Sequence, residues 1–190
     1  MAVTKSRPVE DVLELIKIGH NLFGENRVQE AEKKFKFLRD SDKFELHLIG
    51  PLQSNKVELA LSTFDCIQSL DRKKIVDSIV KFKNTNSGKI LTQNFFIQIN
   101  IGEEIQKSGV SLKNLENFYK YCLECHLLIK GLMCIPPNNE NPKKYFQQMN
   151  EIKNSIDSNL SLSMGMSEDY QLAIQQGSNM IRVGSLLFET

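Results

Sequence analysis

A lysine, an arginine and two serine-glycine segments are the residues of this chain whose types and spacing could do chemistry. Lys5 ends the apolar opening "AVTK", and Arg182 lies in the apolar run "NMIRVG", where it is one of only five arginines against 19 lysines. A desolvated lysine amine of lowered pKa forms a Schiff base with carbonyl compounds. A buried guanidinium needs an acceptor, which is here a phosphate, a pyridine nitrogen or an ordinary buried carboxylate. Most lysines are surface amines, and "AVTK" alone does not decide the role of Lys5.

The segments "SMGMS" (163–167) and "RVGS" (182–185) have the composition of turns that bind an anion. Ser167 stands where a helix N-cap is expected, Gly165 allows the backbone to approach a ligand, and Gly184 and Ser185 open another helix. Barrel proteins often hold a phosphate between the loops after their seventh and eighth strands. The alternative is two well-formed turns without a ligand. We favour the phosphate on this spacing, and the position of Arg182 in an apolar strand strengthens that preference. A strand-end lysine near a phosphate site then suggests a phosphorylated aldehyde such as pyridoxal 5′-phosphate as the ligand.

Short apolar runs alternate with longer amphipathic segments along the whole chain, which is the pattern of strand-helix units in a parallel sheet. The predicted strands are the eight runs 1–5, 20–24, 44–50, 64–70, 94–101, 127–135, 160–165 and 179–184. The predicted helices are 8–18, 26–39, 55–62, 72–84, 112–124, 145–156 and 168–176, and a further helix opens at residue 184. This order positions the reactive residues at strand ends.

Eight parallel strands linked by helices close as a (β/α)₈ barrel, an α/β fold of the TIM type whose active site lies at the carboxyl ends of the strands. Polar residues follow most of those ends, among them Lys5, Asn26 and Asn100. An open doubly wound sheet is the competing fold, but it usually carries a glycine-rich phosphate loop after its first strand, and "MAVTKSRP" has none. Without a repeat or a linker, residues 1–190 are predicted to form a single domain.

Composition excludes several function classes. Hydrophobic residues make up 41% and charged residues 25% of the chain, which is ordinary globular composition. A net charge of +1 argues against nucleic acid or an anionic membrane as the main partner. No apolar run approaches the ~20 residues that span a bilayer, and the start does not read as a signal peptide. We therefore expect a cytoplasmic protein with a small ligand.

The cysteines offer a second kind of chemistry, which we do not favour. Cys66, Cys122, Cys125 and Cys134 are irregularly spaced and are expected to be reduced thiols. The segment "CLECH" at 122–126 has the C-x-x-C-H form of covalent haem attachment, but it closes a run with helical periodicity. Free thiols, buried or half-buried, are the preferred interpretation, and no metal site is predicted.

Six segments together carry a resemblance to a known family. They are "AVTKSRP", "GHNLFGENRVQEAEKK", "HLIGPLQSNK", "FIQINIGEEIQKSGV", "GLMCIPP" and "LSMGMSEDYQLAIQQGSNMIRVGSLLF", and they run from end to end of the chain. In sequence and order they resemble the pyridoxal 5′-phosphate (PLP) homeostasis family. That resemblance implies the fold of the N-terminal barrel of alanine racemase, which is PLP fold type III.

The resemblance also implies a function. Lys5 would hold PLP as a Schiff base, and the protein would buffer or deliver the cofactor inside the cell without catalytic turnover. The alternative is a PLP-dependent amino-acid racemase. The implied cofactor-binding residues are Lys5, Asn26, Ser163, Gly165, Met166, Ser167, Arg182, Gly184 and Ser185. The implied partners are PLP itself and, transiently, PLP-dependent apoenzymes, and the protein is expected to be a monomer.

One departure from the family pattern lies before "AVTK". Family members usually carry about a helix and half a strand of additional sequence there, so we expect a barrel without the usual N-terminal helix. The sequence also ends at "LFET", inside the expected final helix. A third hypothesis follows, in which the barrel binds no cofactor and the protein is colourless.

Overall fold

The computed structural model describes residues 1–40, 43–85 and 90–188. Its sheet is parallel, and each strand pairs with the next one along the chain, in the order β1 to β7. The strands are β1 (Ala2–Val3), β2 (Leu22–Glu25), β3 (Glu45–Leu48), β4 (Cys66–Leu70), β5 (Asn94–Ile99), β6 (Ile129–Cys134) and β7 (Ser161–Ser163). Each one falls within or beside a predicted run, so the strand positions were read correctly from apolar residues.

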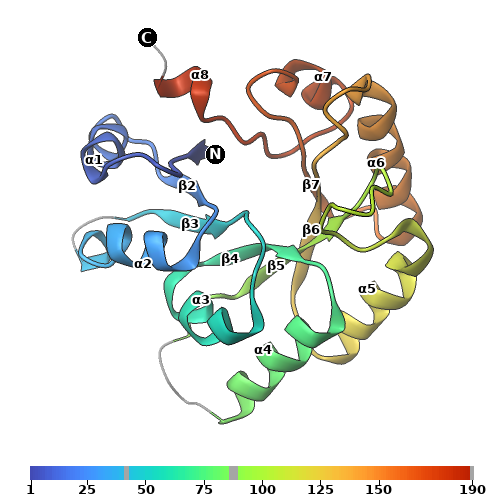
Figure 1. Ribbon diagram of the computed structural model, residues 1–190, viewed down its shortest axis with the longest axis horizontal. Coiled ribbons are helices and arrows are strands. Elements are labelled where there is room, and N and C mark those ends of the chain that lie inside the picture. Colours follow the sequence, from blue (N-terminus) through green and yellow to red (C-terminus); the bar gives the residue numbers. More distant parts are fainter. Residues whose placement is uncertain (41–42, 86–89, 189–190) are drawn as a thin grey trace.

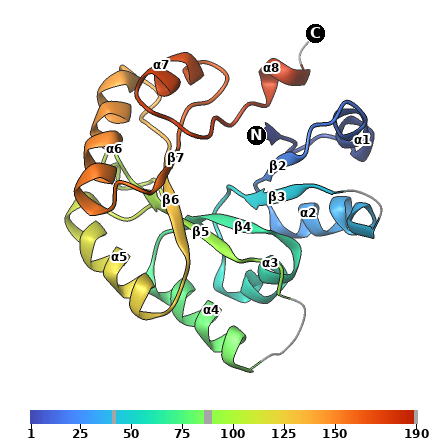
Figure 2. The ribbon, with the colours of Figure 1, turned by 180° about the vertical axis from the view of Figure 1, so that it is seen from behind.

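Helices cover the outside of this sheet (Figures 1 and 2). The α-helices are α1 (Val9–Lys17), α2 (Val28–Phe35), α3 (Val57–Thr63), α4 (Lys73–Thr85), α5 (Leu115–Glu124), α6 (Pro142–Ile156), α7 (Tyr170–Gln175) and α8 (Ser185–Phe188). In the described part of the chain, three 3₁₀ turns accompany them: η1 (Leu38–Asp40), η2 (Ser54–Lys56) and η3 (Leu112–Asn114). Strands inside and helices outside form the barrel architecture that the alternating sequence predicts.

The segment predicted as the eighth strand is not a regular strand. Met180 bridges Ser163 of β7, and Val183 bridges Ala2 of β1, so the segment touches both neighbours but forms no continuous ladder with either. The physical reason is the length of the partners, because β1 has two residues and β7 has three. The segment still closes the ring, since the Val3 amide donates to the Val183 carbonyl at 2.8 Å.

Among the described residues, two hydrophobic clusters fill the space on the two sides of the sheet. The larger cluster lies between the sheet and the helices and includes Ile67, Ile97 and Phe146. The smaller one consists of Cys66, Phe96 and Met133, with Ile135 packed against it. Side chains alternate across a strand, so Cys66 and Ile67 belong to opposite faces. The smaller cluster is therefore the apolar floor of the barrel interior.

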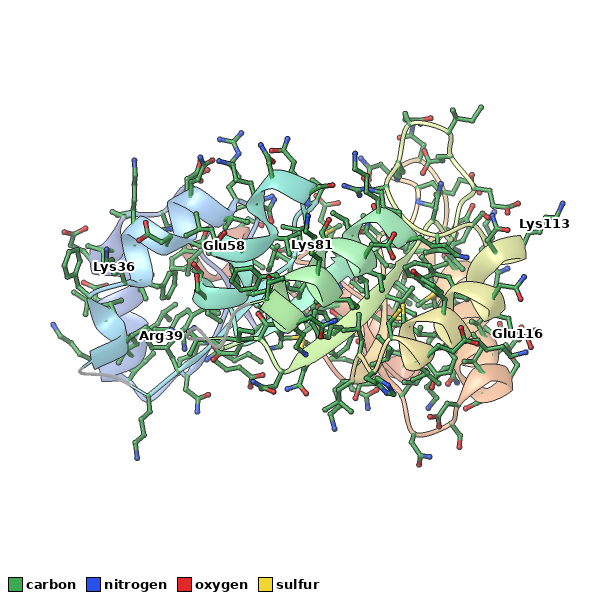
Figure 3. The ribbon with its side chains drawn as sticks, turned by 90° about the horizontal axis from the view of Figure 1, so that it is seen from below. Lys36, Arg39, Glu58, Lys81, Lys113 and Glu116 are labelled. Carbon is green, nitrogen blue, oxygen red and sulfur yellow. The ribbon has the colours of Figure 1, made fainter. Side chains whose placement is uncertain are left out.

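Local sequence explains where the helices begin and what they expose. Asn141 caps α6 by accepting the Lys143 amide at 3.0 Å, and Pro142 occupies the first turn, where no amide donor is needed. Charged residues such as Lys81 and Glu116 stand on the solvent side of the helices (Figure 3). No helix in the described part of the chain is long and apolar enough to cross a membrane.

Candidate functional site

A cavity of about 1040 Å³ opens at the carboxyl ends of the strands. Seven of the nine predicted site residues line it: Lys5, Asn26, Met166, Ser167, Arg182, Gly184 and Ser185. They come from loops that follow β1, β2 and β7 and from the irregular eighth segment, so the fold gathers residues from both ends of the sequence. Ser163 and Gly165 are buried and do not line the cavity.

Lys5 is exposed and sits in a tight turn immediately after β1. The Arg7 amide donates to the Thr4 carbonyl at 3.0 Å and closes this turn. Ser6 has a φ of 61°, which is the left-handed region. No described side chain makes a hydrogen bond or an ion pair with the Lys5 amine, so its nitrogen is free toward the cavity.

A buried ion pair supports this turn from below. Glu25, at the end of β2, is fully buried, and the Lys34 side chain on α2 is 11% exposed, with 2.7 Å between Lys34 Nζ and Glu25 Oε1. The same amine donates to the Thr4 carbonyl at 2.7 Å, and the Thr4 hydroxyl donates to Glu25 at 2.8 Å. Thr4, Glu25 and Lys34 thereby fix the residue that precedes Lys5.

Arg182 lies at the base of the cavity and is 4% exposed. Its Nη1 donates to Ser163 Oγ at 2.9 Å, and its Nη2 donates to the Cys134 carbonyl at 2.8 Å. Burial lowers the pKa of the Arg182 guanidinium, but a guanidinium stays protonated in proteins. Since it has five N–H groups, three are left unused by these two bonds. Arg182 can therefore present a fixed positive charge with free donors to an anion or a ring nitrogen.

The loop after β7 joins the eighth segment through Gly165. This residue has a φ of 96°, and a Cβ added there would lie 2.5 Å from Ala173 Cβ, so only glycine fits. Its carbonyl accepts the Arg182 amide at 2.9 Å. Ser167 Oγ accepts the amide of Leu186 at 3.5 Å, which joins the two predicted anion-binding segments directly. These contacts bring "SMGMS" and "RVGS" together at one edge of the cavity.

Three further residues support the site but are not among the site residues predicted from the sequence. The sequence around Lys34 does not indicate its contact with Glu25, because both residues lie in the segment "GENRVQEAEKK", which contains many other charges. Gly50 is the last residue of the predicted strand 44–50, and a Cβ at this position would lie 2.1 Å from the Asn26 carbonyl oxygen. Because glycine has no side chain, the loop that carries Asn26 can pack directly against the backbone of Gly50. Gln68 had a detectable signal, since it is an amide inside the apolar run "FDCIQSL".

The cysteines occupy the positions of structural thiols. Cys122 is buried on α5, where burial raises the pKa of its thiol to about 12, and burial does the same for Cys134 on β6. Cys125 is half-buried. In the described ranges, no group of three or more His, Cys, Asp or Glu side chains is placed to hold a metal ion. The segment "CLECH" covers the last turn of α5 and its C-cap, Cys125.

Comparison with known proteins gives a consistent result. No protein-family model matches the chain. It is 39% identical to the pyridoxal phosphate homeostasis protein of Aquifex aeolicus, over 99% of this chain and 85% of that protein. It is 33% identical to the protein of the same name from Escherichia coli, over 99% of this chain and 83% of that one.

Solved structures agree with these sequence relatives. PipY of Synechococcus elongatus with PLP bound is 31% identical, with a TM-score of 0.84, over 99% of this chain and 91% of that one. Alanine racemase of Acinetobacter baumannii superposes with a TM-score of 0.76 at 17% identity, over 99% of this chain and 55% of that one. The second likeness concerns the fold alone, and it confirms the predicted alanine-racemase-like barrel.

Proposed function

Because this chain belongs to the pyridoxal phosphate homeostasis protein family, we propose that it binds PLP through Lys5 and carries the cofactor inside the cell. The observation that carries this proposal is the meeting of Lys5 and Arg182 in one cavity with the "SMGMS" and "RVGS" loops. PLP bound in the related PipY structure supports it.

The residues present fit this cofactor. PLP combines an aldehyde, a pyridine ring and a phosphate, and the aldehyde supplies the carbonyl that a lysine amine attacks. Lys5 offers an amine with no described partner. The buried guanidinium of Arg182 has donors to spare, and the hydroxyls of Ser167 and Ser185 stand at the cavity edge. These two serines would hold the phosphate, and Arg182 would hold the phosphate or the ring nitrogen.

A second lysine, Lys107, lines the same cavity and is the obvious competitor for covalent attachment. Its amine lies 2.6 Å from Glu104 Oε2 and donates to the Pro136 carbonyl at 3.1 Å. The Lys107 amine would have to leave both of these partners before it could attack an aldehyde. Lys5 has no such partner in the described part of the chain, so we assign the attachment to Lys5.

The position of Lys5 also suits exchange of the cofactor. Lys5 is exposed on the cavity rim, so an amine from another protein could reach a cofactor held there. We therefore propose that the chain buffers PLP and passes it transiently to PLP-dependent apoenzymes, as a cytoplasmic monomer. This role requires reversible attachment and no catalytic turnover.

The test is the visible absorption of the purified protein after addition of PLP. Wild type should develop a yellow band, Lys5→Ala should not, and Lys107→Ala, the matched control from the same cavity, should keep it. A Lys5→Ala protein that is folded and as yellow as wild type would refute the assignment. A colourless wild type would support the hypothesis of a barrel without cofactor.

Racemisation is tested separately. The yellow protein is incubated with L-alanine or L-serine, and the loss of optical activity is followed. We expect no turnover at rates normal for enzymes, which are ~1 per second or more. Turnover at such a rate would replace the carrier function by that of a racemase.

A further inference from the structure

A line of hydrogen-bonded side chains crosses the barrel interior from the candidate site to the opposite end of β3. We call it the interior chain: Arg182, Ser163, Gln68, His47 and Glu45. Its four contacts measure 2.9 Å (Arg182 Nη1 to Ser163 Oγ), 2.6 Å (Ser163 Oγ to Gln68 Oε1), 2.7 Å (Gln68 Nε2 to His47 Nδ1) and 2.8 Å (His47 Nε2 to Glu45 Oε1). All but Glu45 are buried, and the Glu45 side chain is 51% exposed.

The hydrogen bonds of the interior chain all run in one direction, away from Arg182. A guanidinium only donates, so Ser163 Oγ accepts from Arg182, and the Ser163 hydroxyl donates its own proton to Gln68 Oε1. That contact turns the amide nitrogen of Gln68 toward His47. The Nδ1 of His47 then has to accept, so its ring proton is on Nε2, where the Glu45 carboxylate accepts it. All four donors point the same way.

This arrangement changes the role of Ser163. Its single hydroxyl proton is already donated to Gln68, and the residue is fully buried behind the cavity. Ser163 therefore has no proton left for a phosphate. Its oxygen instead holds one side of the Arg182 guanidinium, while the Cys134 carbonyl holds the other at 2.8 Å.

We propose that Ser163, Gln68 and His47 are positioning residues that fix the Arg182 guanidinium for the cofactor, an inference that rests on the proposed function. A long arginine side chain loses much rotamer freedom when it is held in one place. Both terminal nitrogens of the Arg182 guanidinium are hydrogen-bonded before the cofactor binds. The Arg182 side chain is therefore already ordered, and cofactor binding loses less conformational entropy. Removing a link should therefore weaken cofactor binding through Arg182.

The main experiment is a double-mutant cycle on cofactor affinity, measured by equilibrium dialysis. Gln68→Met keeps the shape of the side chain but removes the amide contacts to Ser163 and His47, together with the contact of Gln68 Nε2 with Met180 Sδ. We expect it to weaken PLP binding ~10-fold. Arg182→Lys should weaken binding at least as much. If Gln68 acts through Arg182, the double variant should bind no more weakly than Arg182→Lys alone. Additive losses, or a Gln68→Met affinity within about twofold of wild type, would overturn the proposal.

Folding is controlled by a neighbour on the same strand. Cys66 lies two residues before Gln68 in the barrel interior and forms no hydrogen bond with the described residues of the interior chain, so Cys66→Ala disturbs packing and leaves the interior chain intact. It should lower the free energy of unfolding but not the cofactor affinity. A Cys66→Ala variant that loses as much affinity as Gln68→Met would show that general destabilisation is the cause.

The tautomer of His47 gives a readout that needs no cofactor. In ¹⁵N-histidine-labelled protein at pH 8, the His47 ring should carry its proton on Nε2, and Ser163→Ala or Gln68→Met should change its ring shifts. A His47 proton on Nδ1 in wild type would contradict the interior chain itself. Failure of the proposed function would appear differently, as wild-type protein that does not bind PLP at all.

Discussion

Lys5 has its position because three buried or half-buried groups hold the backbone immediately before it. Thr4 is fully buried, and its carbonyl accepts both from the Arg7 amide and from the Lys34 amine. Glu25 joins Thr4 and Lys34 through one carboxylate oxygen, while its other oxygen is buried without a partner among the described residues. Removing one partner of such a pair lowers the stability of the fold strongly, because the charge of the other partner stays buried without compensation.

Lys34→Met should lower the free energy of unfolding by ~3 kcal/mol, because it leaves Glu25 buried and unpaired. The measurement is urea unfolding followed by circular dichroism. Arg27→Met is the matched control at the N-cap of the same helix, since the pair of Arg27 with Glu30 is exposed, with side chains 77% and 44% accessible. It should change stability by less than ~0.5 kcal/mol. Equal effects of the two substitutions would contradict the supporting role of Lys34.

Glu45 predicts a pH dependence of stability. The hydrogen bond from His47 lowers the pKa of Glu45 below its ordinary value of 4.5, and the smaller effect of burial acts in the opposite sense. A carboxyl group whose pKa is lower in the folded state stabilises the fold above its unfolded pKa, and this contribution is lost as pH falls through the folded pKa. Unfolding free energy measured below pH 4.5 should therefore fall less steeply for Glu45→Gln than for wild type. Identical slopes would count against the contact.

The sequence predicted which residues lie at the site better than it predicted the contacts that those residues make. The strand-end rule placed Lys5 and Arg182 in one cavity, because every loop after a parallel strand reaches the same edge of the barrel. The same rule assigned Ser163 to a ligand, although its hydroxyl is committed to Gln68. The direction of a hydrogen bond depends on which distant side chain lies opposite, and no local pattern encodes that.

At the scale of elements, the turn that presents Lys5 depends on a left-handed residue. Ser6 is exposed and has a φ of 61°, a conformation that costs a non-glycine residue roughly 1–2 kcal/mol. The turn is tolerated because Thr4 is anchored on both sides. A bulkier or branched residue at position 6 would strain it further.

Ser6→Val should therefore destabilise the protein by ~1 kcal/mol or more, and Ser6→Gly should be neutral or stabilising. Thermal unfolding of the two variants beside wild type is the measurement. We also expect Ser6→Val to weaken attachment of PLP, because the turn carries Lys5. A valine variant as stable as the glycine variant would show that the turn relaxes at no cost.

The sequence pattern predicted the regular elements well, but it predicted the barrel seam poorly, where residues 1–3 meet the segment 179–184. Apolar runs marked β2 to β7 because those strands are buried, and amphipathic spacing marked the helices. The run 179–184 was equally apolar, yet it forms only two isolated bridges, at Met180 and Val183. Whether such a run becomes a strand depends on the length of its partners, β1 and β7, which is a tertiary property.

At the scale of the whole molecule, the site depends on closure between the two ends of the chain. The Val3 amide donates to the Val183 carbonyl at 2.8 Å, and the Val183 amide donates to the Met1 carbonyl at 3.1 Å. Arg7 lies 4.7 Å above the ring of Phe188 on α8. Figure 1 shows the N-terminal strand beside the segment that leads to α8. Lys5 and Ser185 therefore face one cavity only while this seam is closed.

Hydrogen exchange tests closure directly. The amides of Val3 and Val183 should be protected nearly as well as that of Ile97 in the central strand β5, because opening the seam would require loss of the barrel. Mass spectrometry or NMR provides the rates. Exchange of both seam amides at the speed of exposed turns, with Ile97 still protected, would mean that the barrel opens at this point.

The central claim is that Lys5 is the attachment point of PLP, and one measurement tests it most directly. The yellow protein is reduced with borohydride, digested, and its peptides are mapped by mass spectrometry. The account predicts one modified peptide, with the reduced cofactor on Lys5. Modification of Lys107 or another lysine in place of Lys5, or no modified peptide at all, would contradict it.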